Sequence, residues 1–182
     1  MAKTIIVDPE KCLGCKTCEI ECAMAHSSAA DLVEALRDPA STQPRVHVEP
    51  LGEFGMPLQC RHCEDAPCIT VCPTEAIHRF SESGPVVLDA ERCIGCKFCM
   101  LVCPFGVIDL SRDGKAMIKC DQCIERTEAG QEPACVAGCP TKALQYVDVE
   151  DYLRQRRRQA GERIAAGARQ ALKIQSEGQD ER

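Results

Sequence analysis

The sequence contains no tryptophan, and aromatic residues make up only 3% of its 182 positions. Aromatic side chains supply much of the buried area of an ordinary hydrophobic core, so a core built from side chains alone would be thin. No stretch of apolar residues approaches the length of a membrane-spanning helix. The chain needs another source of stability, and its sixteen cysteines are the obvious candidate.

Features typical of enzymes and of nucleic-acid-binding proteins are also missing. There is no glycine-rich nucleotide loop and no nucleophile with a positioned base, so we expect no catalytic site. The net charge is −6, and residues 151–182 carry eight basic and five acidic side chains, which leaves an acidic body unsuited to nucleic acid. The first eight residues show neither an apolar signal core nor twin arginines, which predicts a cytoplasmic protein, where disulfides rarely persist.

Every cysteine falls into one of four motifs. Motif III has the spacing C-x2-C-x2-C-x3-C-P, which holds iron–sulfur clusters through thiolates. Structural zinc instead favours CxxC pairs separated by longer loops, whereas motifs I and III each place three cysteines within seven residues. The pattern therefore predicts iron–sulfur clusters. The motifs are I (Cys12, Cys15, Cys18, Cys22), II (Cys60, Cys63, Cys68, Cys72), III (Cys93, Cys96, Cys99, Cys103) and IV (Cys120, Cys123, Cys135, Cys139).

The four motifs form an internal repeat. Residues 7–16, which lead into motif I, match residues 88–97, which lead into motif III. Motifs II and IV share a longer middle gap and the ending Cys-Pro-Thr-x-Ala. The unit formed by motifs I and II is therefore repeated as motifs III and IV.

The repeat predicts which motifs share clusters. Between motifs II and III, residues 76–80 and 86–88 are typical of two strands joined by a turn at residues 83–85. Motifs I and IV have matching flanks at the two ends of the chain. Residues 144–147 follow motif IV as residues 76–80 follow motif II, and residues 5–8 precede motif I as residues 86–88 precede motif III. We expect these two end segments to pair as strands, so that the chain closes on itself.

In two-cluster ferredoxins the fourth cysteine of one motif ligates the cluster of the other motif. Applied to both pairs of motifs, this crossover predicts four [4Fe–4S] clusters. Cys18 and Cys22 are separated by about 6 Å of rise along one helix. They then bind different clusters, which puts paired clusters within electron-tunnelling range. The predicted ligand sets are Cys12, Cys15, Cys18 and Cys139; Cys22, Cys120, Cys123 and Cys135; Cys60, Cys63, Cys68 and Cys103; and Cys72, Cys93, Cys96 and Cys99.

Two insertions are less regular. In residues 26–59 we expect a short helix at 29–36 and a strand at 45–48, with the chain broken by Pro39, Pro44, Pro50 and Pro57. Residues 124–134 are expected to form a loop within motif IV. Both insertions could contact a partner or could simply cover the clusters.

Histidines and glycines near the motifs have supporting roles in this interpretation. No cysteine is missing from any motif, so no histidine is needed as a ligand. We expect Gly14 and Gly95 to let backbone N–H groups approach sulfur. The four histidines, expected at the surface or beside the ligands, are His26, His47, His62 and His78.

The segment after residue 149 is predicted to be a separate structural element. Residues 150–174 predict one charged helix with a narrow apolar stripe that includes Leu153 and Ile164. The stripe offers too little apolar surface for stable packing on the body, so docking on another subunit is the favoured interpretation. Such docking could also build a higher-order assembly. Residues 176–182 are expected to be disordered.

The segments Cys-Arg-His-Cys-Glu-Asp-Ala-Pro-Cys at 60–68 and Cys-Ile-Gly-Cys-Lys-Phe-Cys-Met-Leu-Val-Cys-Pro-Phe-Gly at 93–106 carry a family resemblance. With the four-motif order, residues 3–149 resemble the electron-transfer subunits of the dimethyl-sulfoxide-reductase type. Formate dehydrogenase beta subunits and the ferredoxin associated with carbon monoxide dehydrogenase are similar. The resemblance implies four [4Fe–4S] clusters in a wire, shared between motifs I and IV and between motifs II and III.

The sequence therefore predicts an α+β protein of two ferredoxin-like units related by pseudo-twofold symmetry, with a C-terminal helical extension. Its domains would be a double ferredoxin-like domain at 1–149, a docking helix at 150–175 and a disordered tail at 176–182. We expect a non-catalytic subunit that relays single electrons between a tungsten or molybdenum enzyme, such as an aldehyde oxidoreductase or formate dehydrogenase, and a flavoprotein or ferredoxin.

Three alternatives stay open. The catalytic partner could be a nickel enzyme, either carbon monoxide dehydrogenase or hydrogenase. The protein could be an assembly protein whose clusters are redox-silent and only hold the fold. It could also be a freely diffusing ferredoxin that purifies without a partner.

Overall fold

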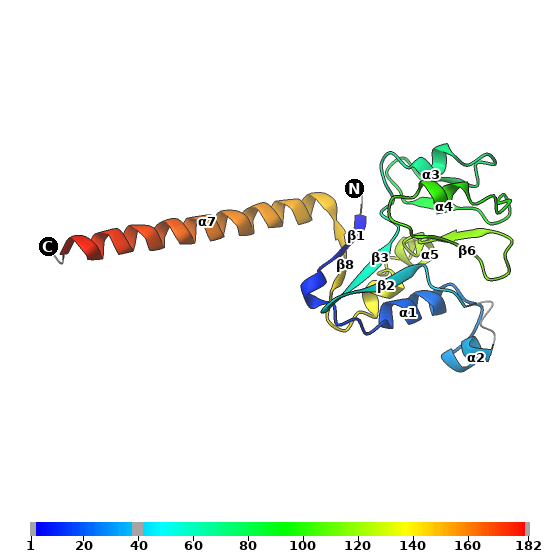
Figure 1. The fold of residues 1–182 in the computed structure, drawn as a ribbon, viewed down its shortest axis with the longest axis horizontal. Coiled ribbons are helices and arrows are strands. Elements are labelled where there is room, and N and C mark those ends of the chain that lie inside the picture. The colour runs from blue at the N-terminus through cyan, green and yellow to red at the C-terminus, as the bar shows by residue number, and fades with distance from the viewer. Residues whose placement is uncertain (1–2, 38–41, 181–182) are drawn as a thin grey trace. The chain divides into compact units, whose positions relative to one another are not determined.

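The computed structural model describes residues 3–37 and 42–180 (Figure 1), and side chains up to residue 170. The chain divides into two units, one made of residues 4–146, called the body here, and one that contains the C-terminal helix. The body is a mixture of short helices and small strand pairs, which matches the predicted α+β class.

The strands pair in four two-stranded sheets. The chain ends meet as predicted, because β1 (Lys3–Val7) pairs with β8 (Leu144–Asp148). The predicted hairpin between motifs II and III is also confirmed, with β4 (Ile77–Arg79) antiparallel to β5 (Val86–Leu88). The other two sheets are the antiparallel hairpins of β2 (Val46–Leu51) with β3 (Phe54–Gln59) and of β6 (Ile108–Leu110) with β7 (Met117–Lys119).

The helices of the body are short, and most carry cysteines. Helices of four to nine residues are too short to be stable alone, so their stability must come from what they pack against. Helix α1 packs against α6, and α3 packs against α4. The helices and single turns are η1 (Pro9–Lys11), α1 (Thr17–Ala25), α2 (Leu32–Arg37), α3 (Pro67–Thr70), α4 (Phe98–Val102), α5 (Ile124–Glu128) and α6 (Ala134–Ala137).

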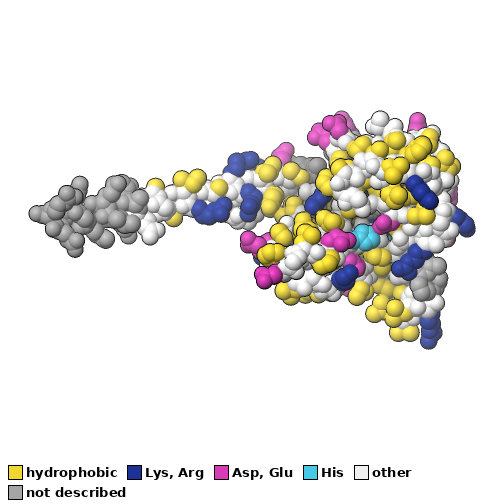
Figure 2. All heavy atoms as spheres, viewed as in Figure 1, with side chains coloured by type: hydrophobic (Ala, Val, Ile, Leu, Met, Phe, Trp, Pro, Cys, Tyr) yellow, Lys and Arg dark blue, Asp and Glu magenta, His cyan; other side chains and the backbone are white. Residues whose placement is uncertain are grey.

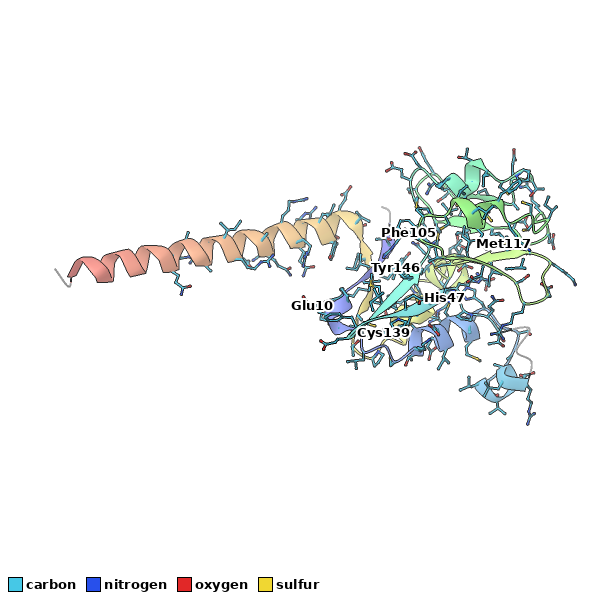
Figure 3. The ribbon with its side chains drawn as sticks, viewed as in Figure 1. Glu10, His47, Phe105, Met117, Cys139 and Tyr146 are labelled. Carbon is cyan, nitrogen blue, oxygen red and sulfur yellow. The ribbon has the colours of Figure 1, made fainter. Side chains whose placement is uncertain are left out.

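Buried side chains form two separate cores that follow the pairing of the motifs. One core joins cysteines of motifs I and IV with Val46, Val48 and the paired chain ends. The other joins cysteines of motifs II and III with Ile77, Ile108 and Met117. Figure 3 shows Cys139 and Met117 in these different parts of the body. We call the two parts the I–IV half and the II–III half.

The internal repeat is reproduced in the backbone. The N–H of Asp8 donates to the carbonyl of Ala143 at 2.8 Å, and the N–H of Asp89 donates to the carbonyl of Ala76 at the same distance. The left-handed backbone conformation, which side chains rarely adopt, also recurs at matching positions. These pairs are Gly14 with Gly95, Lys16 with Lys97, His62 with Gln122, and Glu75 with Lys142.

The prediction for residues 42–59 was wrong in part. Pro50 and Pro57 do not break the chain but lie inside β2 and β3, opposite Gly55 and Val48 respectively. In a two-stranded sheet both strands are edges, where proline is tolerated because its missing N–H can face away from the partner strand. Gly52, with φ of +64°, makes the turn between the strands. Pro39 lies outside the described residues.

Other local predictions also need correction. The helix expected at 29–36 is found at Leu32–Arg37. The expected loop at 124–134 begins with a helical turn, α5, because Cys123 accepts bonds from the N–H groups of Arg126 and Thr127. The hairpin of β6 and β7 was not predicted. Its signal was the alternation of residues 107–110 and 116–119 around a turn that ends at Gly114.

The C-terminal helix α7 (Val149–Asp180) confirms the predicted helix and extends it. It continues past the expected end at residue 174 because no proline follows. The disorder expected from residue 176 is therefore not matched up to Asp180, and residues 181–182 lie outside the described part. Leu153 and Ile164 are exposed by 47% and 74%. Lys and Arg side chains also follow the helix (Figure 2). No helix in the described residues is long and apolar enough to cross a membrane.

Candidate iron–sulfur cluster sites

Two cavities in the II–III half are each lined by four cysteines. One cavity contains three cysteines of motif II and Cys103 of motif III. The other contains three cysteines of motif III and Cys72 of motif II. Each cavity therefore draws three thiols from one motif and the fourth from the other motif. The complete cysteine sets are Cys60, Cys63, Cys68 and Cys103, and Cys72, Cys93, Cys96 and Cys99.

In the I–IV half, thiols of motifs I and IV interact electrostatically with one another. Burial raises the pKa of Cys18 to about 12, and its negative neighbours Glu19, Cys15 and Cys12 add to the effect. The pKa of Cys15 is lowered, chiefly by the Thr17 hydroxyl, and Cys139 opposes that shift. Three motif I thiols thus interact with one another or with Cys139 of motif IV.

The remaining thiols of this half surround Cys135. Burial raises the pKa of the Cys135 thiol, and the next contributions come from Cys120, Cys22 and Cys123. This group again mixes three cysteines of one motif with one of the other. Cys135 also interacts with Cys18, and Cys99 interacts with Cys68, so in both halves the two cysteine groups are neighbours.

Backbone N–H groups point at several sulfur atoms. The amides of His62 and Gln122 lie 3.4 Å from the Sγ atoms of Cys60 and Cys120, at matching positions of motifs II and IV. Such bonds stabilise thiolate charge and tune the potential of an iron–sulfur cluster. Two more amides approach sulfur at 3.3 Å, namely Arg45 to Cys22 and Met117 to Cys93.

Glycines allow the backbone to come close to the motifs. The approach of backbone N–H groups to sulfur at Gly14 and Gly95 stays a prediction. A Cβ at Gly55 in β3 would lie 2.7 Å from the Cα of Gly14 and 3.2 Å from the Sγ of Cys12. A Cβ at Gly95 would lie 2.9 Å from the carbonyl oxygen of Lys115. Both distances are too short for a side chain, so glycine is required where hairpins cover motifs I and III.

His62 lies beside Val86, a residue that lines the cavity of Cys60, Cys63, Cys68 and Cys103. Its Nδ1 lies 3.0 Å from the backbone nitrogen of Val86 and 3.1 Å from the carbonyl oxygen of the same residue. Burial, and then the charge of Lys119, lower the pKa of His62 to about 3, so the ring is neutral. Its Nε2 is buried without a hydrogen-bond partner among the described residues.

A charge network that the sequence did not predict lies beside Cys22. The Nε2 of His26 donates to Asp121 at 3.0 Å, its Nδ1 donates to the carbonyl of Cys22 at 2.8 Å, and Arg45 pairs with Asp121 at 2.5 Å. Although burial lowers it, the bonds to Asp121, Cys123 and Cys22 raise the pKa of His26 to about 12. His26 is therefore a charged supporting residue, and the only available signal was the position of Asp121 inside motif IV.

Asp121 should be the residue on which this network depends. Burial raises its pKa, but the bond from His26 and the charge of Arg45 hold the pKa well below its ordinary value. The Asp121→Asn substitution leaves two partly buried cations without their anion, at an expected cost of about 2 kcal/mol. The midpoint of anaerobic guanidinium unfolding, followed by cluster absorbance, should fall.

The exposed pair of Glu75 with Arg92 provides the control for Asp121. Glu75→Gln removes an anion from a solvated pair and should leave the midpoint unchanged. Equal midpoints for the two variants would contradict the assigned role of Asp121.

Comparison with known proteins agrees with this geometry. Residues 53–149 match the 4Fe-4S dicluster domain, and residues 9–25 match a 4Fe-4S binding domain. The chain belongs to the 4Fe-4S dicluster family. The matched regions and the sixteen cysteines fit four [4Fe–4S] clusters, as the sequence predicts.

Members of this family with similar sequences have electron-transfer names. The electron-transport protein YsaA of Escherichia coli (strain K12) is 47% identical over 87% of this chain and 98% of its own length. An iron-sulfur protein of Rhodospirillum rubrum is 39% identical over 94% and 95%. A sulfite dehydrogenase subunit of Allochromatium vinosum is 35% identical over 81% and 69%. The chain is thus an iron–sulfur electron-transport protein, homologous to non-catalytic subunits of oxidoreductase complexes.

Proposed function

We propose that this chain is a wire in which electrons pass singly through four [4Fe–4S] clusters. The proposed ligand sets are those predicted from the sequence, with one cysteine of each set contributed by the partner motif. The observation that best supports them is the pair of cavities in the II–III half, each lined by three cysteines of one motif and one of the other.

The same observations support two ferredoxin-like units related by pseudo-twofold symmetry. The paired helices, the two cores and the matching amide bonds of Asp8 and Asp89 all recur between the halves. In each half, one helical turn joins ligands of neighbouring sets, such as Cys18 and Cys22 in α1. Neighbouring sets are then close enough for electron transfer within the half.

When bound, a [4Fe–4S] cluster stores and releases one electron. The residues of this chain would hold each cluster and set its potential. The amides of His62, Gln122, Arg45 and Met117 donate to sulfur.

We propose a catalytic subunit as one partner of the wire and a flavoprotein or ferredoxin as the other. A relative is named as a subunit of sulfite dehydrogenase, which supports a catalytic partner of the oxidoreductase class. A tungsten or molybdenum enzyme stays the preferred partner, with a nickel enzyme as the alternative. The exposed apolar side chains of α7 support docking of residues 150–175 on a neighbouring subunit. A cytoplasmic location stays a prediction.

Anaerobic purification from the native host, with metal analysis and identification of co-purifying chains, tests this proposal. We expect about sixteen iron atoms per chain, from four clusters of four, and a large subunit with tungsten or molybdenum. Nickel in a co-purifying chain would instead indicate carbon monoxide dehydrogenase or hydrogenase as the partner. Iron with no partner chain would contradict the subunit role and favour a free ferredoxin.

A redox titration separates the wire from a protein whose clusters only hold the fold. The wire requires that all four clusters are reduced reversibly by dithionite and exchange electrons with the partner. Clusters that stay oxidised in dithionite would overturn the wire and leave the assembly role.

A further inference from the structure

Lys119 is a buried cation at the boundary of the two halves. It is the last residue of β7 and is only 3% exposed. Its Nζ donates to the carbonyl of Cys120 at 2.7 Å and to the carbonyl of Val86. Cys120 belongs to motif IV, whereas Val86 lines the cavity of Cys60, Cys63, Cys68 and Cys103. The ammonium therefore joins a ligand of the I–IV half to a cluster cavity of the II–III half.

The charge of Lys119 lacks an acidic partner within the described part of the protein. No carboxylate of the described residues forms an ion pair with it. The nearest acidic residue in the sequence, Asp121, is already bound by His26 and Arg45. His62, which also contacts Val86, has no acidic group. Burial of an unpaired ammonium is costly, so an anion must balance it.

Lys119 lies between cysteines of both halves. Its Nζ donates to the carbonyl of Cys120 itself, and its other acceptor, the carbonyl of Val86, belongs to a residue that lines the same cavity as Cys68. Cys120 and Cys68 belong to different proposed ligand sets and to different halves. The anions that would balance Lys119 are therefore the two thiolate-bound clusters on either side.

We propose that Lys119 is the shared counter-charge of two inner clusters, the one at Cys22, Cys120, Cys123 and Cys135 and the one at Cys60, Cys63, Cys68 and Cys103. The proposal rests on the ligand sets of the proposed function. A fixed positive charge stabilises the reduced form of each cluster more than the oxidised form. Lys119 thereby raises both potentials together, so the difference that drives an electron from one cluster to the other is preserved.

An anaerobic redox titration of the full chain, followed by electron paramagnetic resonance, tests the proposal. In Lys119→Met, we expect the ratio of reduced to oxidised cluster at a fixed potential to fall about tenfold for two of the four signals. For a one-electron couple that change is a shift of about 59 mV to lower potential. Lys119→Arg keeps the charge and should keep both potentials.

Lys97→Met is the matched control, because Lys97 also lies next to a cluster ligand, Cys96, but is exposed. Water screens its charge, so all four signals should keep their potentials. The two signals that shift in Lys119→Met are identified by their loss in Cys120→Ala and Cys68→Ala. Should Lys119→Met fail to hold four clusters, Lys119→Gln replaces it, since glutamine is neutral and can still donate to a carbonyl.

The outcomes distinguish the two proposals. The role of Lys119 would be overturned, and the wire left intact, by any of three results with four reversible signals. In these results no signal shifts in either neutral variant, all four shift equally, or only one shifts. Shifted signals other than those lost in Cys120→Ala and Cys68→Ala would do the same. Clusters that cannot be reduced at all would instead overturn the wire.

Discussion

Removing Cys12 and Cys139 together is expected to destroy the same single cluster that either substitution damages alone. The two residues belong to one proposed ligand set although they lie at opposite ends of the sequence. The Cys12→Ala/Cys139→Ala double variant should therefore retain three of the four [4Fe–4S] signals. The measurement is the number of intact clusters in the dithionite-reduced protein, counted by electron paramagnetic resonance and by iron content.

The control pairs Cys12 with Cys135, which lies one helical turn before Cys139 in motif IV. These two cysteines belong to different proposed sets, so Cys12→Ala/Cys135→Ala should damage two clusters and leave two. If each motif instead held its own cluster, the two double variants would lose the same number of signals. That result would refute the crossover of the fourth cysteine.

Gly55→Ala is expected to prevent stable formation of the cluster at Cys12. The added Cβ would meet the backbone of Gly14 at 2.7 Å and the Sγ of Cys12 at 3.2 Å. Backbone atoms cannot rotate away as a side chain can, so the hairpin of β2 and β3 must move off motif I. Overpacking of this kind costs about 1–3 kcal/mol, and here it also displaces a ligand.

The measurement is again the count of intact clusters, together with the rate at which they are lost in air. Gly161→Ala, in α7, adds the same methyl group where no atom lies within 4 Å, and should keep four clusters and the rate of the parent protein. Four clusters with an unchanged rate in Gly55→Ala would show that the contact with motif I is not needed.

The parts of the fold that depend on short-range spacing could be predicted from the sequence. The motif spacings indicated iron–sulfur clusters, and the repeat indicated that residues near 5 and 145 pair, as β1 and β8 do. The hairpin of β2 and β3 could not be predicted, because prolines usually end strands and only the two-stranded setting makes Pro50 and Pro57 acceptable.

Features that depend on tertiary burial could not be predicted from the sequence either. In the sequence, Lys119 is simply a lysine that precedes a cysteine, and no pattern around it predicts that its side chain is only 3% exposed. His26, Arg45 and Asp121 come from three separate segments, so their network exists only once those segments pack. Cysteine ligands can be predicted from local spacing, whereas the charged groups around them are known only once the chain is folded.

The pairing of β1 with β8 has a consequence for how the protein is made. Motif I leaves the ribosome first, but its partner strand β8 and, in the proposed ligand set, Cys139 are synthesised more than a hundred residues later. The first cluster set to begin is therefore among the last to be completed, and the thiols of motif I stay open for most of the synthesis of the chain.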